Sequence, residues 1–126
     1  KRHGLDLIYL AAPTTTDARL ETIGNATSGY LYYVSLKGIT GSSKLDTHEV
    51  SQRIAHMRQH VSVPICVGFG IRTAEDAAAI STTADGSIVG TVLVSQVEAL
   101  ANQPEEIPAA LQAILQPMRQ AMDAKA

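Results

Sequence analysis

The sequence predicts an α/β fold in which parallel strands alternate with outer helices. Three features favour this fold: four apolar or β-branched runs, a helical pattern after each run, and glycine or proline near the end of each run. Strands that alternate with helices pair in parallel through right-handed crossovers. Hydrophobic residues make up 45% of the 126 residues and charged residues 17%, which excludes a disordered chain. We therefore expect residues 1–126 to form one domain or a part of one.

The first strand is predicted over residues 5–12. This apolar run barely alternates and ends at Pro13, as expected of a strand buried on both faces. The three threonines that follow offer N-cap hydroxyls for a helix. The charge of Asp17 suits the N-terminus of that helix, which is predicted to run to about Thr27.

The second strand is predicted over the aromatic residues 30–35, and a glycine-bearing loop follows over 37–43. The next helix is predicted over residues 46–60. Its apolar positions are spaced by four, three and four residues, as one face of a helix requires: Val50, Ile54, Met57 and Val61.

The third and fourth strands are predicted over residues 63–67 and 86–89. Glycine follows each strand directly, and a helical pattern follows each glycine. Thr73 and Asp76 have the spacing of a capping box at the start of the third helix. Residues 92–101 are predicted to form the helix after the fourth strand.

A final helix is predicted to begin near Pro104, and Pro117 is expected to kink it. Six apolar residues make up its expected buried face: Ile107, Leu111, Ile114, Leu115, Met118 and Met122.

Two architectures accommodate four such strand–helix units. One is a small open doubly wound sheet. The other is half of a (β/α)₈ TIM barrel, whose full form needs about 250 residues; the chain would then be a fragment that holds the last four βα units. In both, the loops that leave the strands lie on one edge of the sheet, so Tyr32, Gly41, Gly70 and Gly90 are expected to share a rim.

The glycine-bearing loops on this rim predict a phosphate site. Backbone N–H groups at helix N-termini hold a phosphate where no Cβ obstructs close approach. Gly41, Gly70 and Gly90 with Thr91 would converge on one anion. The common barrel phosphate site lies after strands seven and eight, which correspond to the third and fourth strands here. A plain turn explains each glycine taken alone about as well.

The histidines do not predict a metal site. His56 and His60 are four residues apart on the predicted helix, a spacing that can chelate zinc. Met57, however, stands where the glutamate of the H-E-x-x-H motif would be. We therefore expect no metal and interpret the two histidines as a solvated pair, with His60 near the C-terminus of its helix.

Few acid–base groups are predicted on the rim, since the carboxylates have the pattern of helix caps and helix surfaces. Lys37 is expected to be a solvated loop lysine. Only one of Tyr32 and Tyr33 can face a barrel interior, because adjacent strand residues face opposite ways. The single cysteine, Cys66, excludes an internal disulfide, is expected to be an inert thiol, and fits a reducing, cytoplasmic setting.

The charge and the apolar runs exclude two classes of partner. Ten Lys and Arg residues against twelve Asp and Glu residues give a net charge of −2, so no basic field recruits nucleic acid. No apolar run approaches the roughly 18 residues of a membrane span. We expect neither a nucleic-acid partner nor a membrane partner.

Four stretches of the chain have a familiar order and spacing: LAAPTT at 10–15, YYVSLKGITG at 32–41, VGFGIR at 67–72 and VGT at 89–91. They resemble the C-terminal half of the tryptophan synthase α subunit. The resemblance implies a TIM barrel and a carbon–carbon lyase of tryptophan biosynthesis. That lyase cleaves indole-3-glycerol phosphate to indole and glyceraldehyde 3-phosphate. The resemblance also implies no cofactor in this chain and a β-subunit partner that carries pyridoxal phosphate.

The resemblance assigns the substrate phosphate to Gly41, Gly70, Gly90 and Thr91. Thr91 stands where the family usually has serine, so the hydroxyl is kept and a methyl group is added. A role that depends on the backbone amide is expected to survive this change.

The resemblance assigns the indole pocket to Leu10, Tyr32 and Phe69. Thr40 falls in a loop that closes over the site and, in the family, contacts the catalytic aspartate. The family's two catalytic carboxylates belong to its N-terminal half, so no catalytic residue is expected in this chain, where Thr40 and Tyr32 are supporting residues. The fragment alone is expected to be inactive.

Two other functions remain open from the residues. The first is a different phosphate-binding barrel enzyme, since such barrels share paired glycine loops. The second is a half-barrel that self-associates and binds phosphate-bearing ligands without catalysis. An N-terminal half would supply the missing strands in the first case, and a second copy of the chain would do so in the other.

Overall fold

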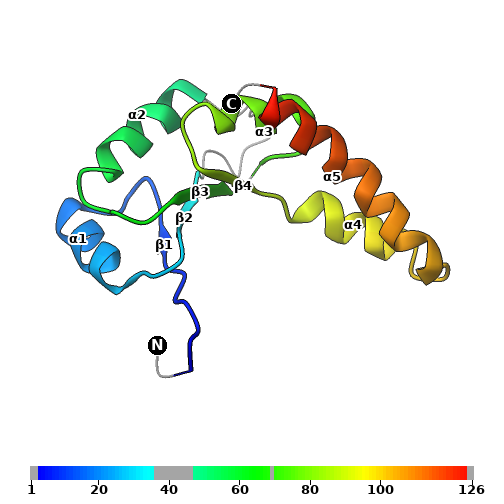
Figure 1. Cartoon of the computed structure of the whole chain (residues 1–126), viewed down its shortest axis with the longest axis horizontal. Helices are drawn as coiled ribbons and strands as arrows, with labels where there is room; N and C mark the ends of the chain where they lie inside the picture. Colours follow the sequence, from blue (N-terminus) through cyan, green and yellow to red (C-terminus); the bar gives the residue numbers. More distant parts are fainter. Residues whose placement is uncertain (1–2, 36–46, 69, 125–126) are drawn as a thin grey trace.

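The computed structural model describes residues 3–35, 47–68 and 70–124. In this part of the chain, four parallel strands form a sheet in the order of the sequence (Figure 1). The strands are β1 (Leu10–Ala11), β2 (Leu31–Val34), β3 (Ile65–Gly68) and β4 (Gly86–Ile88). A doubly wound sheet reverses its strand order partway across, whereas the wall of a barrel does not. The observed order therefore favours the half-barrel over the open sheet.

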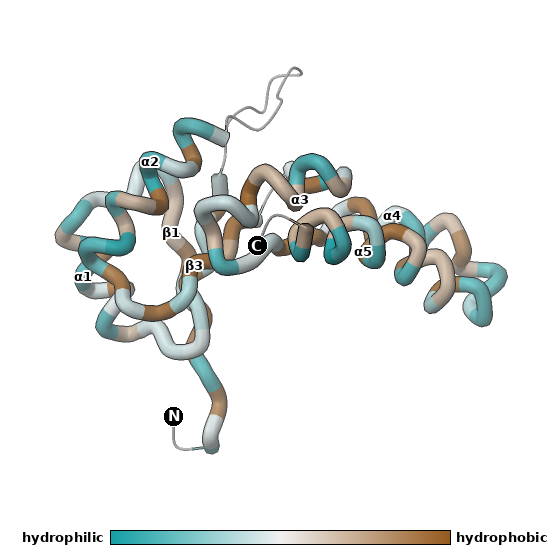
Figure 2. Tube along the Cα trace, turned by 45° about the horizontal axis from the view of Figure 1, so that its top comes forward, coloured by the Kyte–Doolittle hydropathy of each residue, from teal (hydrophilic) through white to brown (hydrophobic). Residues whose placement is uncertain are grey.

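Among the described residues, five α-helices accompany the strands and form an arc around them (Figure 1). They are α1 (Asp17–Ala26), α2 (Thr47–Met57), α3 (Ala74–Ser81), α4 (Thr91–Ala99) and α5 (Ile107–Asp123), with a short 3₁₀ turn, η1 (Pro104–Glu106), before α5. Figure 2 shows α4 and α5 side by side at one end of the molecule. Within the described ranges, no helix is long and apolar enough to cross a membrane.

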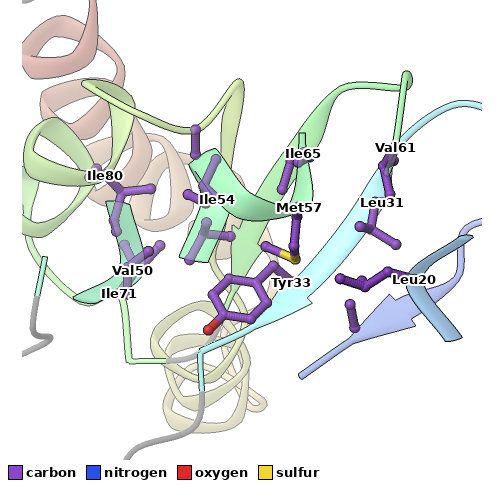
Figure 3. Close-up of a cluster of buried hydrophobic side chains, with 14 of the residues drawn as sticks. Leu20, Leu31, Tyr33, Val50, Ile54, Met57, Val61, Ile65, Ile71 and Ile80 are labelled. Atoms are coloured by element: carbon purple, nitrogen blue, oxygen red, sulfur yellow. The ribbon is translucent and has the colours of Figure 1, made fainter. Parts of the chain in front are cut away.

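The core lies between the sheet and the helices, on what we call the helix-covered face of the sheet. Alternate residues of β2 and β3 are buried on this face: Leu31, Tyr33, Ile65 and Val67. Leu20 of α1 and Ile54 and Met57 of α2 pack into the same cluster (Figure 3). The period of two along the strands and the helical period along α2 meet in this layer, as the sequence predicted.

The opposite face of the sheet, which we call the inner face, carries Leu10, Tyr32 and Cys66. These residues lie in one register row, because Leu10 pairs with Tyr32 and Tyr32 pairs with Cys66. Leu10 is 59% exposed, and the other two side chains are half-buried. Tyr32 and Tyr33 therefore face opposite ways, as predicted, and Tyr32 is the one on the inner face.

The prediction of a first strand buried on both faces is wrong. Only Leu10 and Ala11 form β1 (Figure 1). The residues before it lie beside the segment between α1 and β2, where the Leu7 amide donates to the Ser28 hydroxyl and the Leu7 carbonyl oxygen accepts from the Ser28 amide, both at 3.0 Å. Four large apolar side chains of this run are exposed: Leu5, Leu7, Tyr9 and Leu10. The reason is that β1 is the edge strand of the described sheet, paired with β2 alone. An apolar run indicates that a segment can be buried. Whether it is buried depends on the strands and helices that pack against it in the fold.

The predicted buried face of the last helix is only partly correct. Met118 is buried, and Ile114 and Met122 pack partly against the core. Leu115 is 41% exposed instead. Since α5 packs chiefly against α3 and α4, its apolar face is wider than the surface that these helices cover. The helix continues through Pro117.

Candidate functional site

Gly70 and Gly90 lie at neighbouring places on the rim of the sheet. Gly68 of β3 pairs with Ile88 of β4, and the two rim glycines each follow two residues later. Gly70 has φ +81°, a conformation that favours glycine. A Cβ at Gly70 or at Gly90 would meet no atom of the described residues within 4 Å, so among these residues the backbone at both positions borders open space.

The N-terminus of α4 adds hydrogen-bond donors beside Gly90. Gly90 is the N-cap residue, and its carbonyl oxygen accepts from the amides of Leu93 at 2.9 Å and Val94 at 3.1 Å. The amides at the start of a helix have no acceptor within the helix, and the helix dipole places partial positive charge there. Thr91, the first residue of α4, can therefore present its N–H to an anion.

The Tyr32 ring, carried by the second residue of β2, lies directly over Gly68, the last residue of β3. A Cβ on Gly68 would come within 2.7 Å of Cε1 of Tyr32 and closer still to its Cζ and Oη. Only glycine leaves room for the phenol ring in this place. Sequence reasoning missed this role of Gly68, because a glycine at the end of a strand has the same pattern as an ordinary turn.

Ser35 ties the ends of the two strands together beneath this contact. Its backbone N–H and its side-chain Oγ–H both donate to the carbonyl oxygen of Gly68, at 3.2 and 3.1 Å. Ser35 is buried, so these bonds are shielded from water. They fix the rim where Tyr32 and Gly68 meet.

Cys66 lies on the inner face next to Gly86, where a Cβ would stand 3.0 Å from its Sγ. Burial and the nearby Asp85 carboxylate raise the pKa of the Cys66 thiol. A raised pKa keeps the thiol protonated, and the thiolate is the nucleophilic form. The structure thus agrees with an unreactive thiol.

Two carboxylates near the ends of the strands have structural partners. The carboxylate of Asp76 accepts from the amides of Arg72 and Thr73, both at 3.1 Å, and completes the predicted capping box with the Thr73 hydroxyl. Asp85 accepts from the amide of Ile65 at 2.8 Å and from Arg58 at 2.9 Å, at the start of β3. Asp85 is therefore at the end of the sheet opposite to the rim.

Five of the predicted site residues fall in the part of the chain that the structure describes. It places Leu10 beside Tyr32 on the inner face, and Gly70 near Gly90 and Thr91 on the rim. Three other predicted site residues lie outside the described residues: Thr40, Gly41 and Phe69. Lys37 lies outside them as well.

The comparisons with known proteins agree on one family. Residues 1–123 match the family model described as tryptophan synthase alpha chain. A tryptophan synthase alpha chain of Nitrosococcus oceani is 50% identical over 124 residues, which are 98% of this chain and 46% of that protein. A second, of Marinobacter nauticus, is 48% identical and is also covered to 46%. The chain thus spans about half the length of the curated relatives it matches.

Solved structures give the same result. The crystal structure of tryptophan synthase subunit alpha from Legionella pneumophila superposes with a TM-score of 0.80 at 37% identity, over 98% of this chain and 44% of that one. The open form of tryptophan synthase from M. tuberculosis gives 0.75 at 28% identity, over 96% and 42%. The predicted half of a TIM barrel is confirmed, and so is the resemblance to the tryptophan synthase α subunit.

Proposed function

The chain belongs to the tryptophan synthase alpha chain family, and we propose that it supplies the half of that family's barrel that holds the substrate. The whole protein would catalyse the aldol cleavage of indole-3-glycerol phosphate to indole and glyceraldehyde 3-phosphate. This is a carbon–carbon lyase step of tryptophan biosynthesis. One observation carries the proposal: Gly70 and Gly90 border open space beyond two neighbouring strands, and Tyr32 lies over the end of one of them.

Gly70, Gly90 and Thr91 hold the phosphate in this proposal, together with Gly41. A phosphate dianion needs several N–H donors in close approach, and side chains at the glycine positions would obstruct it. The open space at both glycines among the described residues, and the first amides of α4, which have no acceptor within their own helix, meet this need. The methyl group of Thr91 does not remove its amide.

The indole ring lies on the inner face in this proposal, against Leu10 and Tyr32, with Phe69 completing the pocket. Leu10 is 59% exposed, so an apolar ring that covers it removes apolar surface from water. The Tyr32 ring offers an aromatic neighbour in a position that Gly68 and Ser35 fix. An aromatic ligand therefore fits the inner face better than a plain sugar phosphate.

The acid–base groups come from the N-terminal half of the barrel in this proposal. Aldol cleavage needs one group that removes a proton from the substrate and one that returns a proton to a carbon atom. The Asp76 carboxylate caps α3, and the Asp85 carboxylate accepts a hydrogen bond from the Ile65 amide at the start of β3. Tyr32 and Thr40 would have supporting roles only. Because the catalytic carboxylates belong to the other half, the chain by itself is expected to be inactive.

Indole would pass to a β subunit that carries pyridoxal phosphate, and this chain would need no cofactor of its own. The single cysteine fits the reducing cytoplasm in which such a pathway operates.

A second candidate function is a half-barrel that pairs with another copy of itself and binds phosphate-bearing ligands without catalysis. The exposed apolar side chains at the edge strand favour it: Leu5, Leu7, Tyr9 and Leu10. Unpaired strand edges and exposed apolar surface promote association. Light scattering at micromolar concentration tests this, and a strictly monomeric chain would contradict it.

The main test joins this chain to the N-terminal half of the Nitrosococcus oceani relative. Indole release from indole-3-glycerol phosphate is measured for the fused protein and for this chain alone. We expect activity in the fused protein and none in the chain alone. Turnover that follows the pure chain through a sizing column would overturn the assignment of catalysis to the other half.

The phosphate site has its own test, a titration with inorganic phosphate followed by NMR. We expect the amides of Gly70, Gly90 and Thr91 to shift. Gly70→Asp should weaken binding at least about tenfold, because two unit charges about 4 Å apart repel by roughly 4 kcal/mol at an effective dielectric near 20.

Gly4→Asp is the matched control for this titration. Gly4 shares the positive φ, +68°, and the open Cβ position, but it lies before β1 and away from the rim. The control should bind phosphate like the parent. Unmoved rim amides in a folded parent chain would show that the phosphate assignment is wrong.

A further inference from the structure

Three side chains with metal-ligating atoms meet between α1 and the end of α2. Asp17 Oδ1 lies 2.7 Å from Nε2 of His56. The rings of His56 and His60 have their centroids 5.2 Å apart. One ligand atom from each of the three residues can be chosen so that all three lie within 4.8 Å of one another. The sequence pattern showed the two histidines, but not the carboxylate from the other helix.

The backbones that carry these groups are held close together at one end of α1. Gly24 lies in α1, and a Cβ there would stand 2.7 Å from the carbonyl oxygen of His60 and 3.2 Å from Cγ2 of Val61. Only a glycine allows α1 to approach the turn after α2 this closely. The buried Leu20, between Asp17 and Gly24 in sequence, anchors α1 in the core.

The other end of α1 is held as well. The Arg53 guanidinium of α2 donates a hydrogen bond to the carbonyl oxygen of Thr15, just before α1. The two attachments, at Thr15 and at Gly24, lie on either side of Asp17 along the chain. The spacing of the three ligand groups is therefore set by the packing of two helices and does not depend on exposed side chains alone.

We propose that Asp17, His56 and His60 form a binding site for a divalent cation of the zinc class. Two imidazole nitrogens and one carboxylate oxygen are the ligands that Zn²⁺, Co²⁺, Ni²⁺ and Cu²⁺ prefer, whereas Mg²⁺ and Ca²⁺ prefer oxygen alone. Three protein ligands leave a fourth position of a tetrahedral ion open to water. Glu21 lies beside the cluster, with its Oε1 3.7 Å from Nδ1 of His60.

The present distances are compatible with an ion after small side-chain movements. Ligand atoms about 2.0–2.1 Å from a tetrahedral ion lie about 3.3 Å from one another. The 2.7 Å distance between Asp17 Oδ1 and His56 Nε2 must therefore lengthen. The longest distance between two ligand atoms, up to 4.8 Å, must shorten. The side chains of His56 and Asp17 are 37% and 59% exposed, so both can rotate, while His60 at 18% is the more fixed member.

The charge of the cluster also favours a cation. The Asp17 carboxylate lies directly beside the His56 ring, with Oδ1 2.7 Å from Nε2. Glu21 adds a second carboxylate on the same helix. A divalent cation would take the place of the hydrogen bond between Asp17 and His56.

The test is a titration of the chain with Zn²⁺ in competition with a chromophoric chelator, repeated with Co²⁺ to record its visible spectrum. We expect one equivalent to bind, with the absorption of tetrahedral Co²⁺. His56→Gln and His60→Gln should each weaken the zinc affinity at least about tenfold. Removing a residue that only hydrogen-bonds to a metal ligand already costs about that much, and removing the ligand itself should cost no less. Zinc, but not magnesium, should raise the melting temperature of the parent chain.

His48→Gln is the matched control, because His48 is an exposed histidine on α2 outside the cluster. It should bind zinc like the parent. Circular dichroism checks that every variant is folded, and the same titration on the protein fused to the N-terminal half checks that the site persists in a full barrel. A folded parent that binds no zinc, or equal affinity in the parent and both cluster variants, would show an ion pair only and overturn the proposal.

Discussion

The two faces of the sheet are made by the same strands and differ in what covers them. On the helix-covered face, Leu31 is fully buried against α1 and α2. On the inner face, Leu10 of the neighbouring strand is 59% exposed, and Tyr32 lies over Gly68 at the rim. The first face uses its apolar residues for stability. The second leaves them available for a ligand or for the rest of a barrel, so burial separates structural from functional residues here.

The largest expected effect compares one leucine from each face. Leu31→Ala removes a fully buried side chain and should lower the free energy of unfolding by about 2–5 kcal/mol, because a cavity remains. Leu10→Ala should cost less than about 1 kcal/mol, since most of that side chain already meets water. Urea unfolding measures both. Equal costs would mean that the inner face is buried in solution, for example by a second copy of the chain.

The next effect concerns the contact between Tyr32 and Gly68. Gly68→Ala should cost about 1–3 kcal/mol of stability, because a Cβ has no room beneath the phenol ring. The same substitution in a Tyr32→Ala background should cost much less, since the obstructing ring is gone. A double-mutant cycle by urea unfolding measures this coupling. Independent effects of the two substitutions would contradict the observed contact.

The smallest expected effect leaves stability unchanged and concerns the reactivity of Cys66. Burial raises the pKa of its thiol, so the folded chain should be alkylated more slowly than the chain in urea at the same pH. The rate should rise with pH through the ordinary range of a thiol and beyond it. Mass spectrometry of a single iodoacetamide adduct measures the rate, because the chain has one cysteine.

The fused full barrel gives the control for Cys66. If the N-terminal half packs against the inner face, it should slow alkylation of Cys66 further. If it packed on the other side of the sheet instead, the alkylation rate would not change. Equal rates in the chain and in the fused protein would mean that the inner face stays open. The thiol thus reports which face the missing strands cover.

The sequence by itself determined the elements and their order. The helical period of Val50, Ile54 and Met57 and the capping box of Thr73 with Asp76 depend on residues within one or two turns of each other. The glycines after the third and fourth strands were likewise visible as rim positions. The presence of a hydroxyl did not by itself predict a capping hydrogen bond. Thr16 is the N-cap residue of α1, but its side chain accepts no hydrogen bond there.

Only the tertiary structure decided what each surface touches. The exposed run before β1 and the exposed Leu115 have the composition of buried segments, and their exposure follows from the absence of a covering partner among the described residues. Asp17 meets His56 across 39 positions of the chain, and Tyr32 meets Gly68 across a similar separation. Spacing along a sequence carries no information about such contacts, because they depend on how whole helices and strands pack. The candidate metal cluster and the glycine beneath Tyr32 therefore become visible only after the sheet and its helices are assembled.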